Sequence, residues 1–305
     1  MRIAIFGSGG VGGYFGGRLA AAGEDVTFLA RGAHLTALQR DGLRITSPLG
    51  DVHVARVQAA DRPQAVGPVD VVLFTVKMYD VDASAATLAP LIGPDTVVIA
   101  LQNGVDAMEM VSRHVGAHHV AGGAAYIVAV IDEPGHIRHT IAQQLVFGER
   151  DGRKSERLVA FEQAGIRAGF QARVSTNVDV DLWVKFVRLA TWSGVTTATR
   201  SPMGVVRDTP ETYELMMAAI EEVIAVGKAK GIAFPADLME GTISIIKNFP
   251  PNSKSSMLED IERGRRLELP WLSGAVVRIG REVGVPTPIH QFITTVLTPF
   301  VNGSR

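Results

Sequence analysis

Two parts of the chain carry residues whose types and spacing suit chemistry. Near the N-terminus, six residues match the pattern G-x-G-x-x-G: Gly7-Ser8-Gly9-Gly10-Val11-Gly12. In the distal half, Lys185 lies in an almost wholly apolar stretch that spans Asp181–Leu189. Glycines let a backbone approach an anion closely, and a lysine among apolar neighbours loses hydration and part of its basicity. The sequence therefore suggests an anion-binding turn and a group that can release a proton near neutral pH.

The glycine pattern alone is weak in a chain with 32 glycines, so its context matters. It follows an apolar strand predicted over Arg2–Phe6 and opens a helix predicted to run through Ala22, as a dinucleotide-binding turn requires. In such a turn Gly7 bends the chain, Gly9 admits a pyrophosphate, and Gly12 lets helix and strand pack closely. The helix N-terminus then offers unpaired N–H groups to the anion. The alternative is a glycine-rich turn without a ligand.

The end of the second predicted strand, Asp25–Leu29, indicates which dinucleotide is bound. NAD-binding and FAD-binding turns place a carboxylate there, on the ribose hydroxyl. This chain has Arg31 after the strand, and its acids Glu24 and Asp25 come before the strand's apolar part. A guanidinium can form a charge-assisted fork with a 2′-phosphate, so NADP(H) is favoured over NAD. The alternative for Arg31 is a solvated surface arginine.

Lys77 and Asn103 follow two further predicted strands, Asp70–Val76 and Thr96–Leu101. Ligands of an open α/β sheet bind off the carboxyl ends of its strands, so both residues are expected on the cofactor side. Taken singly, Lys77 is equally well a solvated lysine, and Asn103-Gly104 a turn pair. Because both residues are expected at the same edge of the sheet, we favour a role for them in the binding site.

The distal candidates lie in predicted helices. Lys185 shares a helical stripe with Leu182, Leu189 and Trp192, which predicts a lowered pKa and a proton donor, or else a lysine that snorkels to water. Ser255 is a candidate N-cap for the helix that follows it. Glu268 precedes Leu269-Pro270, where a helix should kink or restart, and its alternative is a solvated glutamate.

The pattern of elements predicts an α/β fold in two domains. Residues 1–175 are expected to form a Rossmann-type, doubly wound, mostly parallel sheet, because short apolar strands alternate with helices. Weaker strands are predicted over Leu43–Ser47 and His118–Val130. Residues 176–305 are expected to be all helical, with helical spacing over 176–200, 211–230, 236–248 and 255–283. The last of these segments could serve a homodimer interface or only the core.

Composition excludes several classes of function. The 305 residues carry a formal net charge of −1, so no basic field exists for nucleic acid or an anionic membrane. The absence of cysteine excludes disulfides and thiol nucleophiles, and no metal site is expected. Since a strand is predicted from Arg2, we expect no signal peptide, and the apolar run Val71–Val76 is too short to span a bilayer. These features favour a cytoplasmic protein.

Taken together, these motifs resemble the ketopantoate reductase (2-dehydropantoate 2-reductase) family. The likeness spans essentially the whole chain, in order: Gly7–Gly12, Arg31, Thr75-Val76-Lys77, Gln102-Asn103-Gly104, Leu182-Trp183-x-Lys185, Ser255-Ser256-Met257 with Asp260, and Glu268. Seven motifs at matching separations are more specific than any one of them. The resemblance implies a Rossmann domain, a helical domain and an active site between them.

The resemblance also implies roles. Lys185 looks like the family's catalytic lysine, which donates a proton to the substrate keto oxygen. Glu268 looks like its essential carboxylate, close to substrate and to the nicotinamide ribose. Asn103 and Lys77 match residues of the cofactor cleft, with Asn103 also near substrate, and Ser256 matches a contact to the substrate carboxylate. The expected reaction is NADPH-dependent reduction of a 2-oxo acid, with ketopantoate as first candidate, giving pantoate for pantothenate biosynthesis.

The chain departs from the family at positions that would hold substrate. Asparagines four and eight residues after the catalytic lysine are replaced by Leu189 and Ser193, and a third asparagine is replaced by Met203. Apolar replacements bind a hydroxyl poorly, so a sibling enzyme for another keto acid or an imine is the main alternative. A non-catalytic NADP sensor is a further alternative, but it would need neither Lys185 nor Glu268.

Overall fold

The computed structural model describes residues 1–303 and divides into two compact units. The first unit comprises residues 1–102 and 106–178, and the second comprises residues 103–105 and 179–305. The chain therefore changes unit at Val178/Asp179, close to the predicted boundary. The short excursion over residues 103–105 was not expected from the sequence. No helix in the described part of the chain is long and apolar enough to span a membrane.

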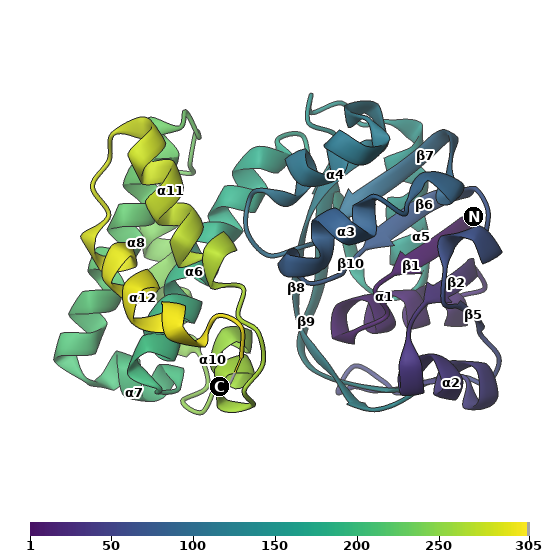
Figure 1. Cartoon of the computed structure of the whole chain (residues 1–305), viewed down its shortest axis with the longest axis horizontal. Helices are drawn as coiled ribbons and strands as arrows, with labels where there is room; N and C mark the ends of the chain where they lie inside the picture. The colour runs from purple at the N-terminus through teal and green to yellow at the C-terminus, as the bar shows by residue number, and fades with distance from the viewer. Residues whose placement is uncertain (304–305) are drawn as a thin grey trace. The chain divides into compact units, whose positions relative to one another are not determined.

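The first unit is built on one mixed, mainly parallel sheet (Figure 1). Its main path runs β4-β3-β9-β8-β7-β6-β1-β2-β5, and β10 pairs with β9. Only the pairings β3–β4 and β8–β9 are antiparallel. The strands are β1 (Arg2–Phe6), β2 (Asp25–Leu29), β3 (Leu43–Thr46), β4 (Val52–Val54), β5 (Gln58–Ala60), β6 (Val69–Phe74), β7 (Ile92–Ala100), β8 (Val120–Glu133), β9 (His136–Gly148) and β10 (Gln171–Val174).

The helices of this unit cover the sheet and complete its core. They are α1 (Gly10–Ala21), α2 (Gly32–Asp41), α3 (Val81–Ala85), α4 (Ala107–Val115) and α5 (Glu156–Arg167). Helix α1 packs on β8 and β9, whereas α4 packs on α3 and β8. Central strand residues such as Ile5, Leu73 and Ile99 are fully buried. Their continuous apolar character is what strands covered on both faces require, and it confirms the predicted fold class.

The predicted weak strand His118–Val130 is a longer element than expected. It is β8, which extends to Glu133 and forms an antiparallel hairpin with β9. The sequence analysis assigned no element to β9, α5 or β10. Register shifts interrupt the hairpin between Tyr126 and Glu133, and its distal residues are exposed, so the apolar pattern there is weak.

The second unit is helical, as predicted. Its helices are α6 (Val178–Thr199), α7 (Met203–Asp208), α8 (Pro210–Ala229), α9 (Leu238–Asn248), α10 (Ser256–Glu262), α11 (Ser273–Val283) and α12 (Pro288–Leu297). The core of this unit includes Phe186, Ile220, Val223, Leu272 and Val276, all nearly or fully buried. The apolar faces of these helices therefore pack against one another and form a core separate from that of the sheet.

The helical segment predicted over 255–283, with a kink or restart at Leu269-Pro270, is interrupted earlier and over a longer stretch than expected. Helix α10 ends at Glu262, an irregular stretch follows, and a short 3-10 turn over Leu269–Trp271 precedes α11. Gly264 has a φ of 63°, which does not continue an α-helix, and Pro270 cannot donate a backbone hydrogen bond. The break places Glu268 on an irregular segment rather than on a helical face.

We predict unequal effects on stability for two glycines of the same turn. At Gly12 an added Cβ would lie 2.5 Å from Thr75 Oγ1 and 2.9 Å from Ile5 Cγ2, whereas at Gly9 no atom lies within 4 Å. Gly12→Ala should lower the free energy of unfolding by about 1–3 kcal/mol through overpacking. Gly9→Ala, at an extended φ of −73°, should leave it nearly unchanged. Urea denaturation of both variants provides the measurement, and equal effects would contradict the predicted packing.

Candidate active site

The glycine-rich turn Gly7–Gly12 lies at the carboxyl edge of the sheet. Phe6, the last residue of β1, is in register with Leu29 of β2 and with Phe74 of β6. Phe74 is in turn in register with Ala100 of β7. The segments that follow these four parallel strands therefore emerge at one edge, as the sequence predicted. They carry the glycine turn, Arg31, Lys77 and Asn103, respectively.

Helix α1 begins within the turn and leaves its first N–H groups available. Gly9 is the N-cap, no side chain caps the helix, and its first turn contains no acidic residue. The N–H groups of Gly10, Val11 and Gly12 have no acceptor within an α-helix. With the open space beside Gly9, they form a cradle of the size and charge that a phosphate group fits.

Side chains within the turn hold its shape. Ser8 is buried, and its Oγ donates to the carbonyl of Leu29 at 3.0 Å. Thr75 Oγ1 donates to the carbonyl of Gly7 at 2.6 Å. The side chain of Ser8 is thus used inside the turn, which leaves its neighbours' backbone to face an anion. In the sequence Thr75 stood out only as part of the motif Thr75-Val76-Lys77.

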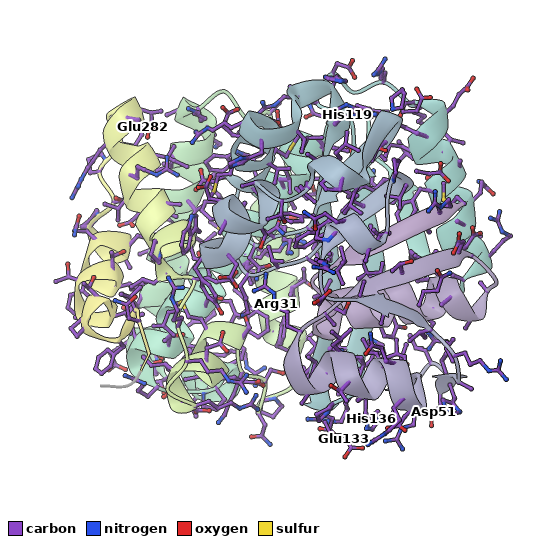
Figure 2. The ribbon with its side chains drawn as sticks, turned by 45° about the vertical axis from the view of Figure 1, so that its right-hand side comes forward. Arg31, Asp51, His119, Glu133, His136 and Glu282 are labelled. Atoms are coloured by element: carbon purple, nitrogen blue, oxygen red, sulfur yellow. The ribbon has the colours of Figure 1, made fainter. Side chains whose placement is uncertain are left out.

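Two cationic residues stand at the same edge of the sheet. Arg31 is exposed and is the N-cap residue of α2, directly after β2 (Figure 2). Within residues 1–303 its guanidinium has no hydrogen-bond or ion-pair partner. Lys77 is partly buried and follows β6 as the N-cap residue of a 3-10 turn. Both are placed where a nucleotide phosphate at the cradle's edge would meet positive charge.

Gln102 is a polar residue of this edge for which the sequence predicted no role. Its Nε2 donates to the carbonyls of Phe74 and Val76, at 2.9 and 3.2 Å. The residue is buried, and among the described residues its Oε1 has no hydrogen-bond partner. Gln102 therefore ties the ends of β6 and β7 together and keeps one buried acceptor. Its signals in the sequence were its place directly after an apolar strand and its membership of the motif Gln102-Asn103-Gly104.

Asn103 belongs to the helical unit and is held there by close backbone packing. The adjacent Gly104 has a φ of 97°, and a Cβ at this position would lie 2.7 Å from the carbonyl oxygen of Trp271. Glycine is therefore required for the chain to pass so close to the segment that contains Glu268. Val105 packs on the helical core beside it. This contact explains why three residues leave the first unit.

Asn103 links the two charged groups of the helical unit. Its Nδ2 donates to Glu268 Oε2 at 3.3 Å, and its Oδ1 accepts from Lys185 Nζ at 3.1 Å. Glu268 is only 4% exposed. Three residues far apart in the sequence thus form one chain of hydrogen bonds: an ammonium, an amide and a carboxylate.

The environment of Lys185 changes its acidity. Burial lowers the pKa of Lys185 to about 8, and the negative charge of Glu268 partly offsets this by favouring the ammonium. The predicted apolar stripe is present, because Leu182 is buried and Leu189 and Trp192 pack against the helical core. At neutral pH this lysine is mostly charged, yet it releases a proton far more readily than a solvated lysine does.

The other residues predicted for the site are not part of the hydrogen-bonded chain Lys185–Asn103–Glu268. Leu189 is partly buried one turn after Lys185 on α6. Ser193 is fully buried, and its Oγ has no partner. Ser256 is exposed at the first residue of α10, whereas Ser255 is the N-cap of that helix, as predicted, and accepts from Leu258 N at 3.1 Å.

The charged groups of the helical unit are arranged in a way that suits proton transfer. Among the described residues, no three His, Cys, Asp or Glu side chains are grouped to hold a metal ion. What the helical unit does offer is an ammonium oriented by an amide and balanced by a buried carboxylate. Such an ammonium can stabilise negative charge on a substrate oxygen and then protonate it.

Comparison with known proteins assigns the family. Residues 3–152 match the family Ketopantoate reductase PanE/ApbA, and residues 177–300 match Ketopantoate reductase PanE/ApbA C terminal. The chain belongs to the ketopantoate reductase family. It is 32% identical to the 2-dehydropantoate 2-reductase of Mesorhizobium japonicum, over 94% of each chain. The resemblance inferred from the motifs is therefore confirmed, and with it an oxidoreductase family.

Solved structures agree with this assignment. A PanE/ApbA family ketopantoate reductase from Ralstonia eutropha JMP134 has a TM-score of 0.91 at 30% identity and 98% coverage of both chains. The 2-dehydropantoate 2-reductase of Geobacter metallireducens GS-15 has a TM-score of 0.90 at 29% identity, covering 98% of this chain and 99% of its own. The family fold therefore extends over both units.

We expect Glu268→Gln to lower the pKa of Lys185 below about 8. The carboxylate favours the ammonium electrostatically, so its removal leaves desolvation unopposed. The pH dependence of Lys185 labelling by trinitrobenzenesulfonate, followed by peptide mass spectrometry, gives the midpoint. Glu262→Gln, which removes an exposed carboxylate paired with Lys254, is the control and should not move it. A midpoint that rises in Glu268→Gln would refute this account.

Proposed function

We propose that the chain catalyses the NADPH-dependent reduction of a 2-oxo acid to a 2-hydroxy acid, with ketopantoate as the first substrate to test. The observation that carries this proposal is the hydrogen-bonded chain Lys185–Asn103–Glu268, with its lysine pKa of about 8. Membership of the ketopantoate reductase family supports the reaction type.

The first unit has features that fit a dinucleotide. The open cradle at the start of α1 suits the pyrophosphate, through the backbone of Gly7–Gly12. The unpartnered Arg31 suits a 2′-phosphate, which favours NADPH over NADH, and Lys77 adds charge at the same edge. When bound, the nicotinamide supplies the hydride that reduces the keto carbon.

Lys185 acts as the proton donor in this proposal. As negative charge develops on the keto oxygen, the ammonium stabilises it and then transfers a proton to it, which leaves a neutral amine. The lowered pKa makes that transfer easier than it would be from a solvated lysine. Asn103 fixes the direction of the ammonium, and the negative charge of Glu268 helps to keep it charged before the reaction. The neutral amine that remains takes up a proton from solvent.

A related reductase with another substrate is the second candidate, because of three positions at which the family carries asparagines that hold substrate. Leu189 and Met203 supply no hydrogen bond from their side chains, and the Ser193 hydroxyl is fully buried. We assign Leu189, Ser193 and Ser256 to the substrate side of the site by their match to positions of the family. The apolar side chains of Leu189 and Met203 suit the carbon frame of an oxo acid better than they suit a second hydroxyl.

The proton-donor role predicts that Lys185→Met abolishes turnover but not cofactor binding. The expected loss is about 10²–10⁴-fold in kcat, the usual contribution of a general acid. NADPH absorbance gives turnover on ketopantoate and other 2-oxo acids, and cofactor fluorescence gives binding. Lys228→Met, at an exposed position of α8, is the control. Full activity in Lys185→Met would contradict the assignment of Lys185 as the proton donor.

Binding of the 2′-phosphate by Arg31 predicts that Arg31→Gln weakens the binding of NADPH but not that of NADH. Losing the charge-assisted fork should raise KM for NADPH about tenfold or more while leaving KM for NADH nearly unchanged. Assays with both cofactors side by side make the comparison. A uniform change in both KM values would mean that Arg31 does not distinguish the 2′-phosphate from the hydroxyl.

A further inference from the structure

A small slot opens beside the helix that carries Lys185. Its volume is about 30 Å³, enough for one or two water-sized groups. It lies wholly within the helical unit, between α6, α9 and neighbouring segments. Most of its wall is apolar, and its lining includes Arg188, Thr191, Trp192, Met203, Ile245 and Phe249.

Two hydrogen-bonding groups in the slot have no partner in the described structure. Thr191 is only 1% exposed, and its Oγ1 makes no hydrogen bond. The indole Nε1 of Trp192 is likewise buried and unpaired, while its ring packs on Phe249 with centroids 4.6 Å apart. Leaving a buried donor unsatisfied is costly, so these groups point to an occupant that accepts hydrogen bonds.

The third donor of the slot is a cation without a counter-ion. Arg188 is partly buried, and its Nε donates to Thr242 Oγ1 at 3.4 Å. Thr242 Oγ1 itself donates to the Leu238 carbonyl, so it is free to accept. Within residues 1–303 Arg188 has no ion pair, and no residue that lines the slot is acidic.

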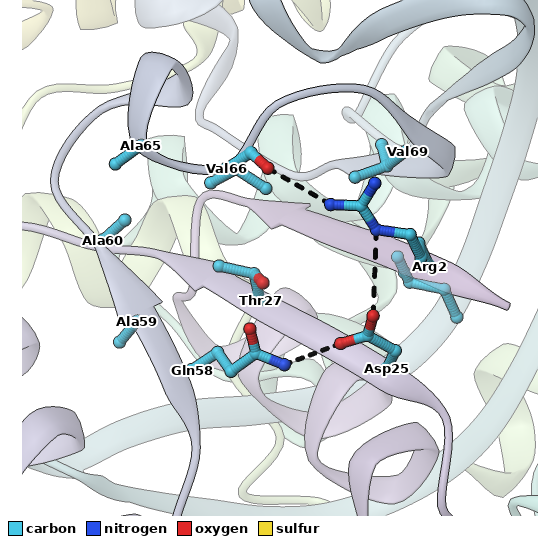
Figure 3. Close-up of a pocket in the computed structure, with 10 residues that line it drawn as sticks. Arg2, Asp25, Thr27, Gln58, Ala59, Ala60, Ala65, Val66 and Val69 are labelled. Atoms are coloured by element: carbon cyan, nitrogen blue, oxygen red, sulfur yellow. Dashed lines mark hydrogen bonds and ion pairs between the residues drawn. The ribbon is translucent and has the colours of Figure 1, made fainter.

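A second pocket contains an arginine whose charge is already paired, and it serves as a comparison for Arg188. A larger hollow of about 290 Å³ lies at the amino ends of β1 and β2, and Arg2 lines it (Figure 3). There the guanidinium donates to the Val66 carbonyl at 3.2 Å and pairs with Asp25 at 3.8 Å. Arg188 has no such carboxylate, so its charge remains available to a ligand.

We propose that this slot binds a terminal carboxylate of the substrate, which makes the substrate a 2-oxo diacid. The inference rests on the proposed function. Arg188 and Trp192 follow Lys185 by three and seven residues, about 4.5 and 10 Å along the axis of α6 and on neighbouring faces. A keto group at Lys185 and a carboxylate in the slot are therefore separated by a chain of a few carbons.

Other termini match the slot less well. An apolar end would leave the donors of Thr191 and Trp192 buried and unpaired. A hydroxyl could satisfy one or two of them, but it would not neutralise Arg188. A carboxylate offers two charged oxygens to a guanidinium, an indole N–H and a hydroxyl, and its size suits a slot of about 30 Å³.

The test compares three 2-oxo acids that differ at the far end. 2-Oxoglutarate ends in a carboxylate, 5-methyl-2-oxohexanoate is its branched apolar isostere, and ketopantoate ends in a hydroxyl. We expect kcat/KM of the wild type to be highest for 2-oxoglutarate.

Arg188→Met should lower kcat/KM for 2-oxoglutarate about tenfold or more, while kcat/KM for 5-methyl-2-oxohexanoate should be unchanged or higher. Thr191→Val should act in the same direction, and Arg281→Met, which removes an exposed arginine of α11, should not.

The outcomes separate this inference from the proposed function. If the wild type reduces some of these acids but Arg188→Met leaves their ranking unchanged, or if ketopantoate is preferred, the slot assignment is overturned while the reductase stands. If no acid is reduced, the proposed function fails. Calorimetry with glutarate then still tests the slot, because binding that does not weaken in Arg188→Met overturns it.

Discussion

The proposed chemistry depends on one partly buried hydrogen-bonded chain in the helical unit. Asn103 accepts from the ammonium of Lys185 with one end of its amide and donates to the carboxylate of Glu268 with the other. The two charges are thus connected through a neutral group. This arrangement lets a partly desolvated lysine stay cationic at neutral pH while its pKa falls to about 8. A buried cation without such partners would be expelled to water or lose its proton.

The fold is arranged to make that chain possible. Asn103 follows strand β7, Lys185 lies on helix α6, and Glu268 lies in the break between α10 and α11. Gly104 allows the chain to approach the carbonyl of Trp271, which brings the amide next to the carboxylate. The irregular segment around Glu268 therefore positions the carboxylate beside the Asn103 amide.

The two units contribute different kinds of chemical groups to the proposed reaction. The sheet unit offers backbone N–H groups and the cations Arg31 and Lys77, which suit phosphates. The helical unit offers desolvated side chains, which suit proton transfer and selection of a carbon frame. The slot with Arg188 extends this second role, because a charge held in an apolar wall discriminates between substrates by the group at their far end.

The sequence by itself determined the glycine-rich turn between β1 and α1, the mainly parallel sheet, the helical second half and the apolar setting of Lys185, because these depend on local pattern and spacing. It did not determine the hairpin of β8 and β9, whose irregular register and exposed distal residues leave a weak apolar pattern, or the end of α10 at Glu262. Nor did it single out Arg188 or the role of Asn103 as a bridge. The bridge depends on hydrogen bonds between residues 82 and 165 positions apart, and the availability of Arg188 depends on which partners its charge does not find, both of which only tertiary packing decides.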